Sequence, residues 1–111
     1  MKVTYTTKNN RLTAEIEGDS PRDVFGSIAK FQEVFEENVC GKCDSENLKF
    51  VVRNVDDNFY YEIRCLGCGA RLSFGSHKKG GGLFPKRKDS EGNWLPDHGW
   101  VKWNPKTEKN E

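Results

Sequence analysis

Four cysteines in two closely spaced pairs constrain the fold of this chain more than any other feature. Cys40 and Cys43 form the first pair, Cys65 and Cys68 form the second, and the sequence contains no other cysteine. Two intervening residues allow one tight turn to direct both sulfur atoms at a single point, so two such turns can complete a tetrahedral shell of thiolates. This spacing predicts a closed, structural site for one Zn²⁺ ion with all four cysteines as its ligands.

Other chemistries of paired cysteines stay open at this point. Disulfides need an oxidising compartment, and no secretory signal or transmembrane segment is recognisable in the sequence. A redox Cys-x-x-Cys motif normally occurs once and opens a helix after a strand, whereas an iron–sulfur cluster accepts the same four thiolates. We favour zinc, and we expect a reducing, cytoplasmic location with no membrane partner.

The segment between the two cysteine pairs has the pattern of a β-hairpin. Residues 48–53 and 59–64 are rich in β-branched and aromatic side chains, and the turn-forming stretch 54–58 separates them. We therefore expect two strands joined by a five-residue loop. A third strand is predicted at 71–74, directly after the second cysteine pair.

The residues before the first cysteine pair predict a second hairpin followed by one helix. Within residues 2–17, apolar and polar side chains alternate on both sides of a turn at residues 8–10. Ser20 and Pro21 have the pattern of a helix start, and apolar side chains then recur at helical spacing to about Glu37. The apolar stripe of this helix should pack on the hairpin.

Together these elements predict an α+β protein. We expect a hairpin and helix at 1–38, a cysteine-containing ribbon at 39–75, a Gly/Lys-rich loop and a tryptophan segment packed back onto the ribbon at 76–103, and a frayed tail at 104–111. The chain has 111 residues, of which only 34% are hydrophobic. This length favours one compact unit, and the small core favours a metal as an additional source of stability.

Positive charge is concentrated directly after the predicted ribbon hairpin. The net charge of the chain is +1, but residues 64–88 contain seven Lys or Arg and no Asp or Glu. Three glycines at 80–82 separate two basic clusters, and all three tryptophans lie within residues 94–103. Cations can follow the phosphates of a nucleic acid while rings stack on its bases. The alternative is a solvated basic loop whose neighbouring aromatic side chains belong to the core.

We therefore predict a non-catalytic nucleic-acid-binding protein, with single-stranded DNA as the favoured ligand. The predicted contacts are the cationic and aromatic residues Arg64, Arg71, Lys78, Lys79, Phe84, Lys86, Arg87, Lys88, Trp94 and Trp100. The alternative function is a protein–protein adaptor or inhibitor that docks through the ribbon and the tryptophan face, which the acidic residues 1–63 would suit. No catalytic motif is recognisable around His77 or His98, so we expect no enzymatic activity.

The two cysteine knuckles with their intervening hairpin, residues 40–68, resemble the zinc-ribbon family. This resemblance implies a small antiparallel sheet clamped by zinc and a role in binding nucleic acid or protein. A second likeness runs from Tyr61 to Trp103 and is carried by the runs Cys-Leu-Gly-Cys-Gly-Ala-Arg-Leu, Gly-Gly-Leu-Phe-Pro-Lys-Arg-Lys and Gly-Trp-Val-Lys-Trp. It is similar to small bacteriophage zinc-ribbon proteins of recombination modules. It implies a role in phage recombination or replication in the bacterial host cytosol, with a recombination or replication protein as a further partner.

Overall fold

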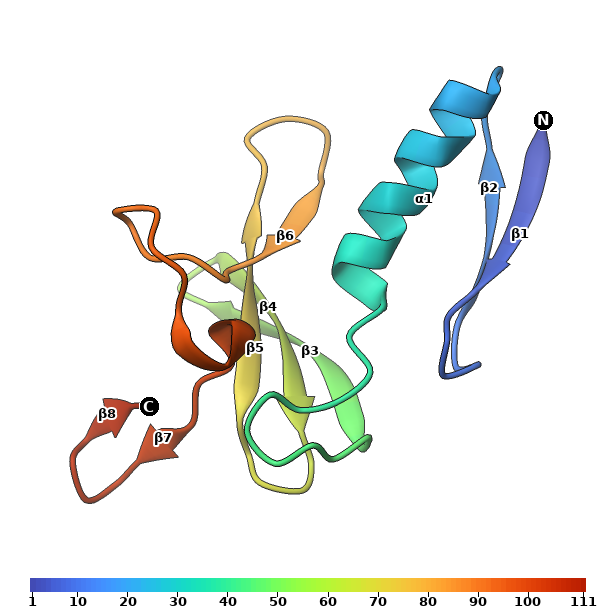
Figure 1. Ribbon diagram of the computed structural model, residues 1–111. Helices are drawn as coiled ribbons and strands as arrows, with labels where there is room; N and C mark the ends of the chain where they lie inside the picture. Colours follow the sequence, from blue (N-terminus) through green and yellow to red (C-terminus); the bar gives the residue numbers. More distant parts are fainter. The chain divides into compact units, whose positions relative to one another are not determined.

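A β-hairpin covered by a single helix forms the first part of the chain. The computed structural model describes residues 1–111 and has two units, Met1–Asn38 and Val39–Glu111, where the sequence analysis expects one. In the first unit, β1 (Lys2–Thr6) pairs antiparallel with β2 (Thr13–Glu17), and α1 (Pro21–Phe35) follows (Figure 1). The protein contains no helix with the length and apolar character that a membrane crossing requires.

Helix α1 begins as its sequence predicts. The Ser20 hydroxyl oxygen accepts a hydrogen bond from the Asp23 backbone N–H at 3.2 Å, and Pro21 occupies the first helical position. This cap satisfies one of the amides that a helix start leaves without an intrahelical partner. The helix ends at Phe35, two residues before the predicted end at Glu37.

Aromatic and polar contacts attach α1 to its hairpin. The Tyr5 ring packs edge-on against Phe31, with 5.7 Å between ring centroids. The Tyr5 hydroxyl donates a hydrogen bond of 2.7 Å to the Glu36 carboxylate, which also accepts one of 3.0 Å from the Lys8 backbone N–H. The side chains of Ile16 and Val24 are buried in the same unit. The predicted packing of the helix on the hairpin is therefore confirmed.

A four-stranded antiparallel sheet is the frame of the second unit. Its strands are β3 (Leu48–Val55), β4 (Asn58–Cys65), β5 (Arg71–Ser76) and β6 (Leu83–Pro85), and they lie in this order across the sheet (Figure 1). The predicted ribbon hairpin is thus present, and β5 extends two residues beyond the predicted strand 71–74. With one helix and small antiparallel sheets, the protein is α+β, as the sequence predicts.

The hairpin of β3 and β4 closes on a two-residue turn, so the prediction of a five-residue loop at 54–58 is wrong. Val55 pairs with Asn58, and only Asp56 and Asp57 lie between them. Their φ angles are 51° and 64°, and two successive left-handed residues are the pattern of a type I′ turn. Because the turn is short, Arg53 pairs with Tyr60.

The chain after β6 returns to the sheet and ends in a small hairpin. A short 3₁₀ helix, η1 (Pro96–Gly99), leads into a bridge between Arg71 and Val101. Strands β7 (Trp103–Asn104) and β8 (Lys109–Asn110) then pair antiparallel. The expectation of a frayed tail at 104–111 is therefore wrong. The backbones of Lys102 and Glu111 exchange hydrogen bonds of 2.7 and 2.8 Å, which continue this pairing.

The core of the second unit lies on one face of the sheet. Ile63 and Leu72 are 1% and 0% exposed. Arg71 pairs with Val101 in an antiparallel bridge, so their neighbours Leu72 and Trp100 lie opposite each other on the same face of the sheet. Trp100 is only 1% exposed. The prediction of Trp100 as a stacking ring is therefore wrong, since its indole is enclosed by the core. A Cβ atom placed on Gly41 would lie 2.5 Å from Trp100 Cδ1, so the first cysteine turn packs directly on this ring.

The turn at Asp56 and Asp57 provides a test of the β3–β4 register. Replacing Asp57 by Gly should raise the free energy of unfolding of the second unit by about 0.5–1 kcal/mol, because glycine adopts a positive φ without steric cost. Urea denaturation with zinc present measures the change. The neighbouring Asn58→Gly substitution is the control and should lower stability, because glycine weakens a strand. A longer loop at 54–58 would instead make both changes nearly neutral.

Candidate functional site: a four-cysteine centre and its basic surroundings

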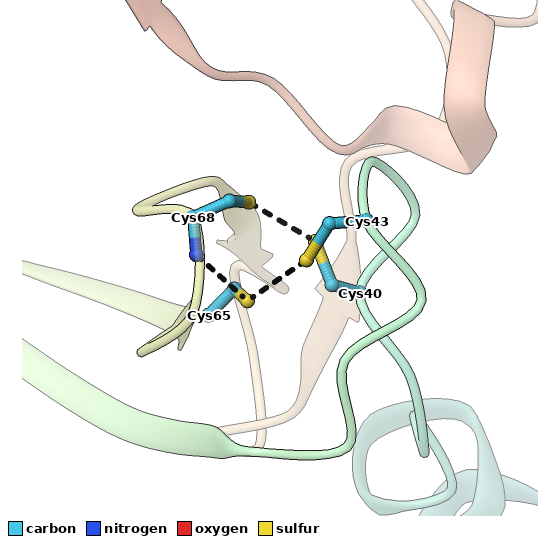
Figure 2. Close-up of side chains that lie close together, drawn as sticks. All are labelled: Cys40, Cys43, Cys65 and Cys68. Atoms are coloured by element: carbon cyan, nitrogen blue, oxygen red, sulfur yellow. Dashed lines mark hydrogen bonds between the residues drawn. The ribbon is translucent and has the colours of Figure 1, made fainter.

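Four sulfur atoms converge between two turns of the second unit (Figure 2). Cys40 Sγ lies 3.6 Å from Cys68 Sγ, Cys43 Sγ lies 3.5 Å from Cys65 Sγ, and all four atoms lie within 4.8 Å of one another. A tetrahedral shell with metal–sulfur bonds of about 2.3 Å has sulfur–sulfur separations of about 3.8 Å. The cysteines are free thiols. They can hold one metal ion, as the spacing of the cysteines predicts.

In both cysteine turns, backbone N–H groups donate hydrogen bonds to a cysteine sulfur atom. The Lys42 N–H donates to Cys40 Sγ at 3.3 Å. In the second turn, the Gly67 N–H donates to Cys65 Sγ at 3.3 Å, and the Cys68 N–H donates to the same atom at 3.4 Å, as Figure 2 shows for Cys68. Such amide–sulfur contacts favour the thiolate form that a metal requires.

The two turns have the same backbone geometry four residues after the first cysteine of each pair. Asp44 has a φ of 61° and Gly69 a φ of 82°. Their N–H groups donate to the carbonyl oxygens of Cys40 and Cys65, each at 3.0 Å. A residue in the left-handed region therefore closes each turn. Glycine fits this position without cost and aspartate at a modest one.

The pKa values of the two most buried thiols, Cys40 and Cys65, are shifted in opposite directions. Burial raises the pKa of Cys40 to about 12, and contacts with the Cys68 and Cys43 thiols act in the same direction, against the Lys42 and Cys43 amides that lower it. Burial works in the same direction at Cys65, but hydrogen bonds from the Cys68 amide, the Cys43 thiol and the Gly67 amide lower the pKa of Cys65 to about 6. A cation among the four sulfur atoms would stabilise every thiolate.

Asp97 of η1 contacts the first cysteine turn at two places. The Lys42 ammonium forms an ion pair of 2.5 Å with the Asp97 carboxylate, and the Lys42 side chain is only 21% exposed. A Cβ atom on Gly41 would also lie 2.7 Å from the Asp97 carbonyl oxygen. This close approach explains why a glycine occupies that position in the turn.

A buried carboxylate on β4 gathers three arginines. The Glu62 side chain is 2% exposed. One of its oxygens lies 2.5 Å from Arg53 Nε, and the other lies 3.3 Å from Arg64 Nε and 3.9 Å from Arg71 Nε. Burial acts to raise the pKa of Glu62, but the hydrogen bonds and charges of Arg64 and Arg53 hold that pKa below its ordinary value. Glu62 is therefore a buried anion surrounded by cations.

Sequence reasoning identified Arg64 and Arg71 but missed Arg53 and Glu62. Alternation along 59–64 does place Glu62 beside Arg64 on one face of the strand. The missing information was the register of β3, because a five-residue loop would place Arg53 opposite Phe59 and on the other face. In the observed register Arg53 lies opposite Tyr60.

The other predicted cations lie on the β5–β6 loop and on the segment after β6. The side chains with large exposure are Lys78, Lys79, Lys86 and Lys88. Arg87 is half-buried, and its guanidinium donates a hydrogen bond to the His98 carbonyl oxygen. Arg87 therefore helps to attach the chain beyond β6 to η1.

Two of the three predicted rings are reachable from solvent. Trp94 is 71% exposed, and the Lys88 ammonium lies 4.4 Å from its ring centroid. Phe84 is half-buried, with its ring centroid 4.9 Å from that of His77. The buried Trp100 differs from both, so the tryptophan segment supplies one core ring and exposed rings as well.

Comparisons with protein-family models, with curated proteins and with solved structures found no match to this chain. The class of protein is therefore defined by the geometry described above. It is an α+β protein with a four-cysteine cluster that can bind one metal ion, an arrangement consistent with a zinc ribbon.

Removal of the metal tests the cysteine centre. We expect one tightly bound ion per chain, and its extraction by a chelator should abolish the near-UV circular dichroism of Trp100, because that ring packs on the first cysteine turn. Cys40→Ser should lower metal affinity strongly, while Ser90→Ala on the surface should leave the affinity unchanged. Full alkylation of the thiols in the metal-loaded protein at the rate of the unfolded chain would contradict this assignment.

Substitution of the buried carboxylate tests the arginine cluster. Glu62→Gln keeps the size of the side chain but removes its charge, so it should lower the free energy of unfolding by about 1–3 kcal/mol. The arginines are partly exposed and can recover some hydration, which limits the loss. Urea denaturation measures the change against the exposed control Glu46→Gln, expected within about 0.5 kcal/mol of the parent. Equal stability of the two variants would show that the charge of Glu62 does not stabilise the fold through the arginines.

Proposed function

We propose that the second unit is a zinc ribbon that binds nucleic acid without catalysing a reaction, with single-stranded DNA as the favoured ligand. One observation carries this proposal: exposed cations and exposed aromatic rings occur together on the sheet and on the loops beside it, in the unit that contains the four-cysteine cluster. Phosphates attract the cations, and unpaired bases offer faces on which the rings can stack.

The chemistry of the ligands favours zinc as the metal. Four thiolates in a closed tetrahedron are the usual set of a structural Zn²⁺ site, whereas Mg²⁺ and Ca²⁺ prefer oxygen. When bound, Zn²⁺ supplies structural cross-linking and leaves no coordination position for a substrate. This closed ligand set supports a binding role rather than an enzymatic one. An iron–sulfur cluster would use the same cysteines and would give the protein a visible absorption spectrum.

The charge distribution supports placing the nucleic-acid interface on the second unit. Residues 39–111 contain 13 Lys or Arg and 10 Asp or Glu, whereas residues 1–38 contain 5 and 7. The lysines of the β5–β6 loop and of the following segment are exposed and can approach phosphates. Gly80 and Gly81, with φ angles of 83° and 68°, form the tip of that loop, where a backbone without side chains allows a strand to come close.

The likeness of residues 61–103 to bacteriophage zinc-ribbon proteins supports a narrower version of the proposal. In this version the protein acts in phage recombination or replication, in the host cytoplasm, on single strands that those processes expose. A recombination or replication protein is the further partner that this role requires.

Neutralising loop lysines tests the proposed interface. The triple variant Lys78→Ala, Lys79→Ala and Lys86→Ala should bind a fluorescent oligo-dT about 10-fold or more weakly than the parent at low salt, because it loses three phosphate contacts. Fluorescence anisotropy over a salt series should also show that the slope of log affinity against log salt concentration is smaller in magnitude by about 2. The control variant Lys8→Ala, Arg11→Ala and Lys30→Ala removes the same charge from the first unit and should bind like the parent.

The alternative function, a protein-binding adaptor or inhibitor, gives a different result in the same experiment. An adaptor would bind neither single strands nor duplex, and the fluorescence of Trp94 would not change on addition of oligonucleotide. Absence of binding by the parent protein at low salt would therefore overturn the proposed nucleic-acid function.

A further inference from the structure

We infer that the polar face of the β3–β6 sheet is the surface on which the nucleic-acid strand lies, with the arginines around Glu62 binding phosphate and with Tyr60 and Phe84 stacking on bases. This inference rests on the proposed function and names the surface that carries it. The polar face is defined here by the side chains of Lys49, Arg53, Tyr60, Glu62, Arg64, Arg71 and Phe84.

The strand register places these side chains in rows on one face. Arg53 pairs with Tyr60, and Gly75 pairs with Phe84. Continuing the β4–β5 register by one residue from the Tyr61–Phe74 pair brings Tyr60 opposite Gly75. Side chains in register across a sheet share a face, so Arg53, Tyr60 and Phe84 form one row.

A second row lies four residues away along the strands. Lys49 pairs with Arg64, and Arg64 pairs with Arg71. Glu62 lies between the two rows, next to Arg64 in its own strand. The second row therefore presents three cations side by side: Lys49, Arg64 and Arg71.

The charges of this face do not cancel. Three guanidinium groups surround one carboxylate, which leaves an excess of positive charge before Lys49 is added. The Glu62 side chain is 2% exposed, while the side chains of Arg53, Arg64 and Arg71 are 44%, 44% and 31% exposed. An approaching strand would therefore meet cations rather than the anion. Each guanidinium has five N–H donors, so contact with Glu62 leaves donors free for phosphate oxygens.

Glu62 acts here as a positioning residue. Its two oxygens accept hydrogen bonds from both Arg53 and Arg64, which reduces the rotamer freedom that a flexible arginine loses on binding. Arg53 also lies 5.5 Å from the centroid of the Tyr60 ring, so the same carboxylate orients the ring through Arg53. The phosphate-binding and base-stacking parts of the face are thus connected.

Tyr60 and Phe84 form the stacking part of this face. Tyr60 is 45% exposed. Gly75 between them has no side chain, and a Cβ atom there would lie 2.5 Å from Phe84 Cζ, so the Phe84 ring extends over Gly75 toward Tyr60. A larger residue at position 75 would displace that ring. His77 packs against Phe84 and leads into the β5–β6 loop, whose lysines extend the path of the strand.

The opposite face of β4 supplies a matched control for the stacking ring. Phe59 is the immediate neighbour of Tyr60 and is 58% exposed, but alternation directs it to the other face. The two positions thus offer the same kind of change, an exposed ring replaced by a methyl group, on opposite sides of one strand.

The experiment measures binding of a fluorescent oligo-dT by anisotropy. Tyr60→Ala should weaken binding about 5- to 150-fold, since one stacked base is lost, and Tyr60→Phe should stay within about twofold of the parent because the ring is retained. Phe59→Ala should bind like the parent. Arg64→Gln should weaken binding and reduce the logarithmic salt slope by about 0.7, the loss of one phosphate contact. Metal content and far-UV circular dichroism of each variant establish that it is folded.

The outcomes separate the inference from the proposed function. If the parent and the Tyr60→Ala variant bind equally while the loop-lysine variant binds weakly, nucleic-acid binding stands and the polar face is overturned as its site. If Phe59→Ala weakens binding and Tyr60→Ala does not, the strand lies on the apolar face and the inference is again overturned. A parent protein that binds no strand overturns both. Duplex binding that Tyr60→Ala leaves unchanged supports the inference, because paired bases do not reach the ring.

Discussion

The convergence of four cysteine sulfur atoms is the feature on which the second unit depends. Cys65 ends β4, and Cys40 and Cys43 belong to the turn that packs on Trp100, so a metal among them would join the sheet to its core ring. Metal binding to such a site contributes on the order of 10 kcal/mol to folding. That contribution is as large as the net stability of an ordinary domain. A sheet with few buried apolar side chains can therefore leave much of its surface to polar and exposed aromatic residues.

The polar side of the sheet shows how a stability requirement can prepare a surface for binding. Burying Glu62 is costly unless its charge is compensated. Arg53 and Arg64 provide that compensation, and they hold the carboxylate below the outer surface. Because three cations surround one anion, the compensation leaves an excess of positive charge directed outward. The arrangement that stabilises the buried group thus also presents ordered donors to an anionic ligand, which links the fold to the proposed function.

Much of this architecture could be predicted from local patterns, and the errors have a common cause. The cap at Ser20, the cysteine turns and the three ribbon strands depend on neighbouring residues, and the structure contains them. The turn at Asp56 and Asp57 lacks the glycine that usually marks a two-residue hairpin, so the sequence favoured a longer loop. The longer loop shifts the predicted pairing by one residue, which places Arg53 opposite Phe59 instead of Tyr60 and on the wrong face of the sheet. The pairing of Lys102 with Glu111, which orders the end of the chain, leaves no local signal in either segment.

What the sequence by itself determined is the α+β class, the helix start and the four cysteines that can bind one metal ion, because these features arise from short-range spacing and backbone preference. The tertiary structure alone decided which tryptophan is core and which arginines meet a common carboxylate. Trp100 is enclosed in part because Gly41, distant in the chain, lacks a side chain and leaves room for one large ring beside the sheet. Arg53 and Arg64 share Glu62 because antiparallel pairing brings β3 beside β4 in one particular register. Such contacts depend on how separate segments pack, and no local pattern of residues encodes that.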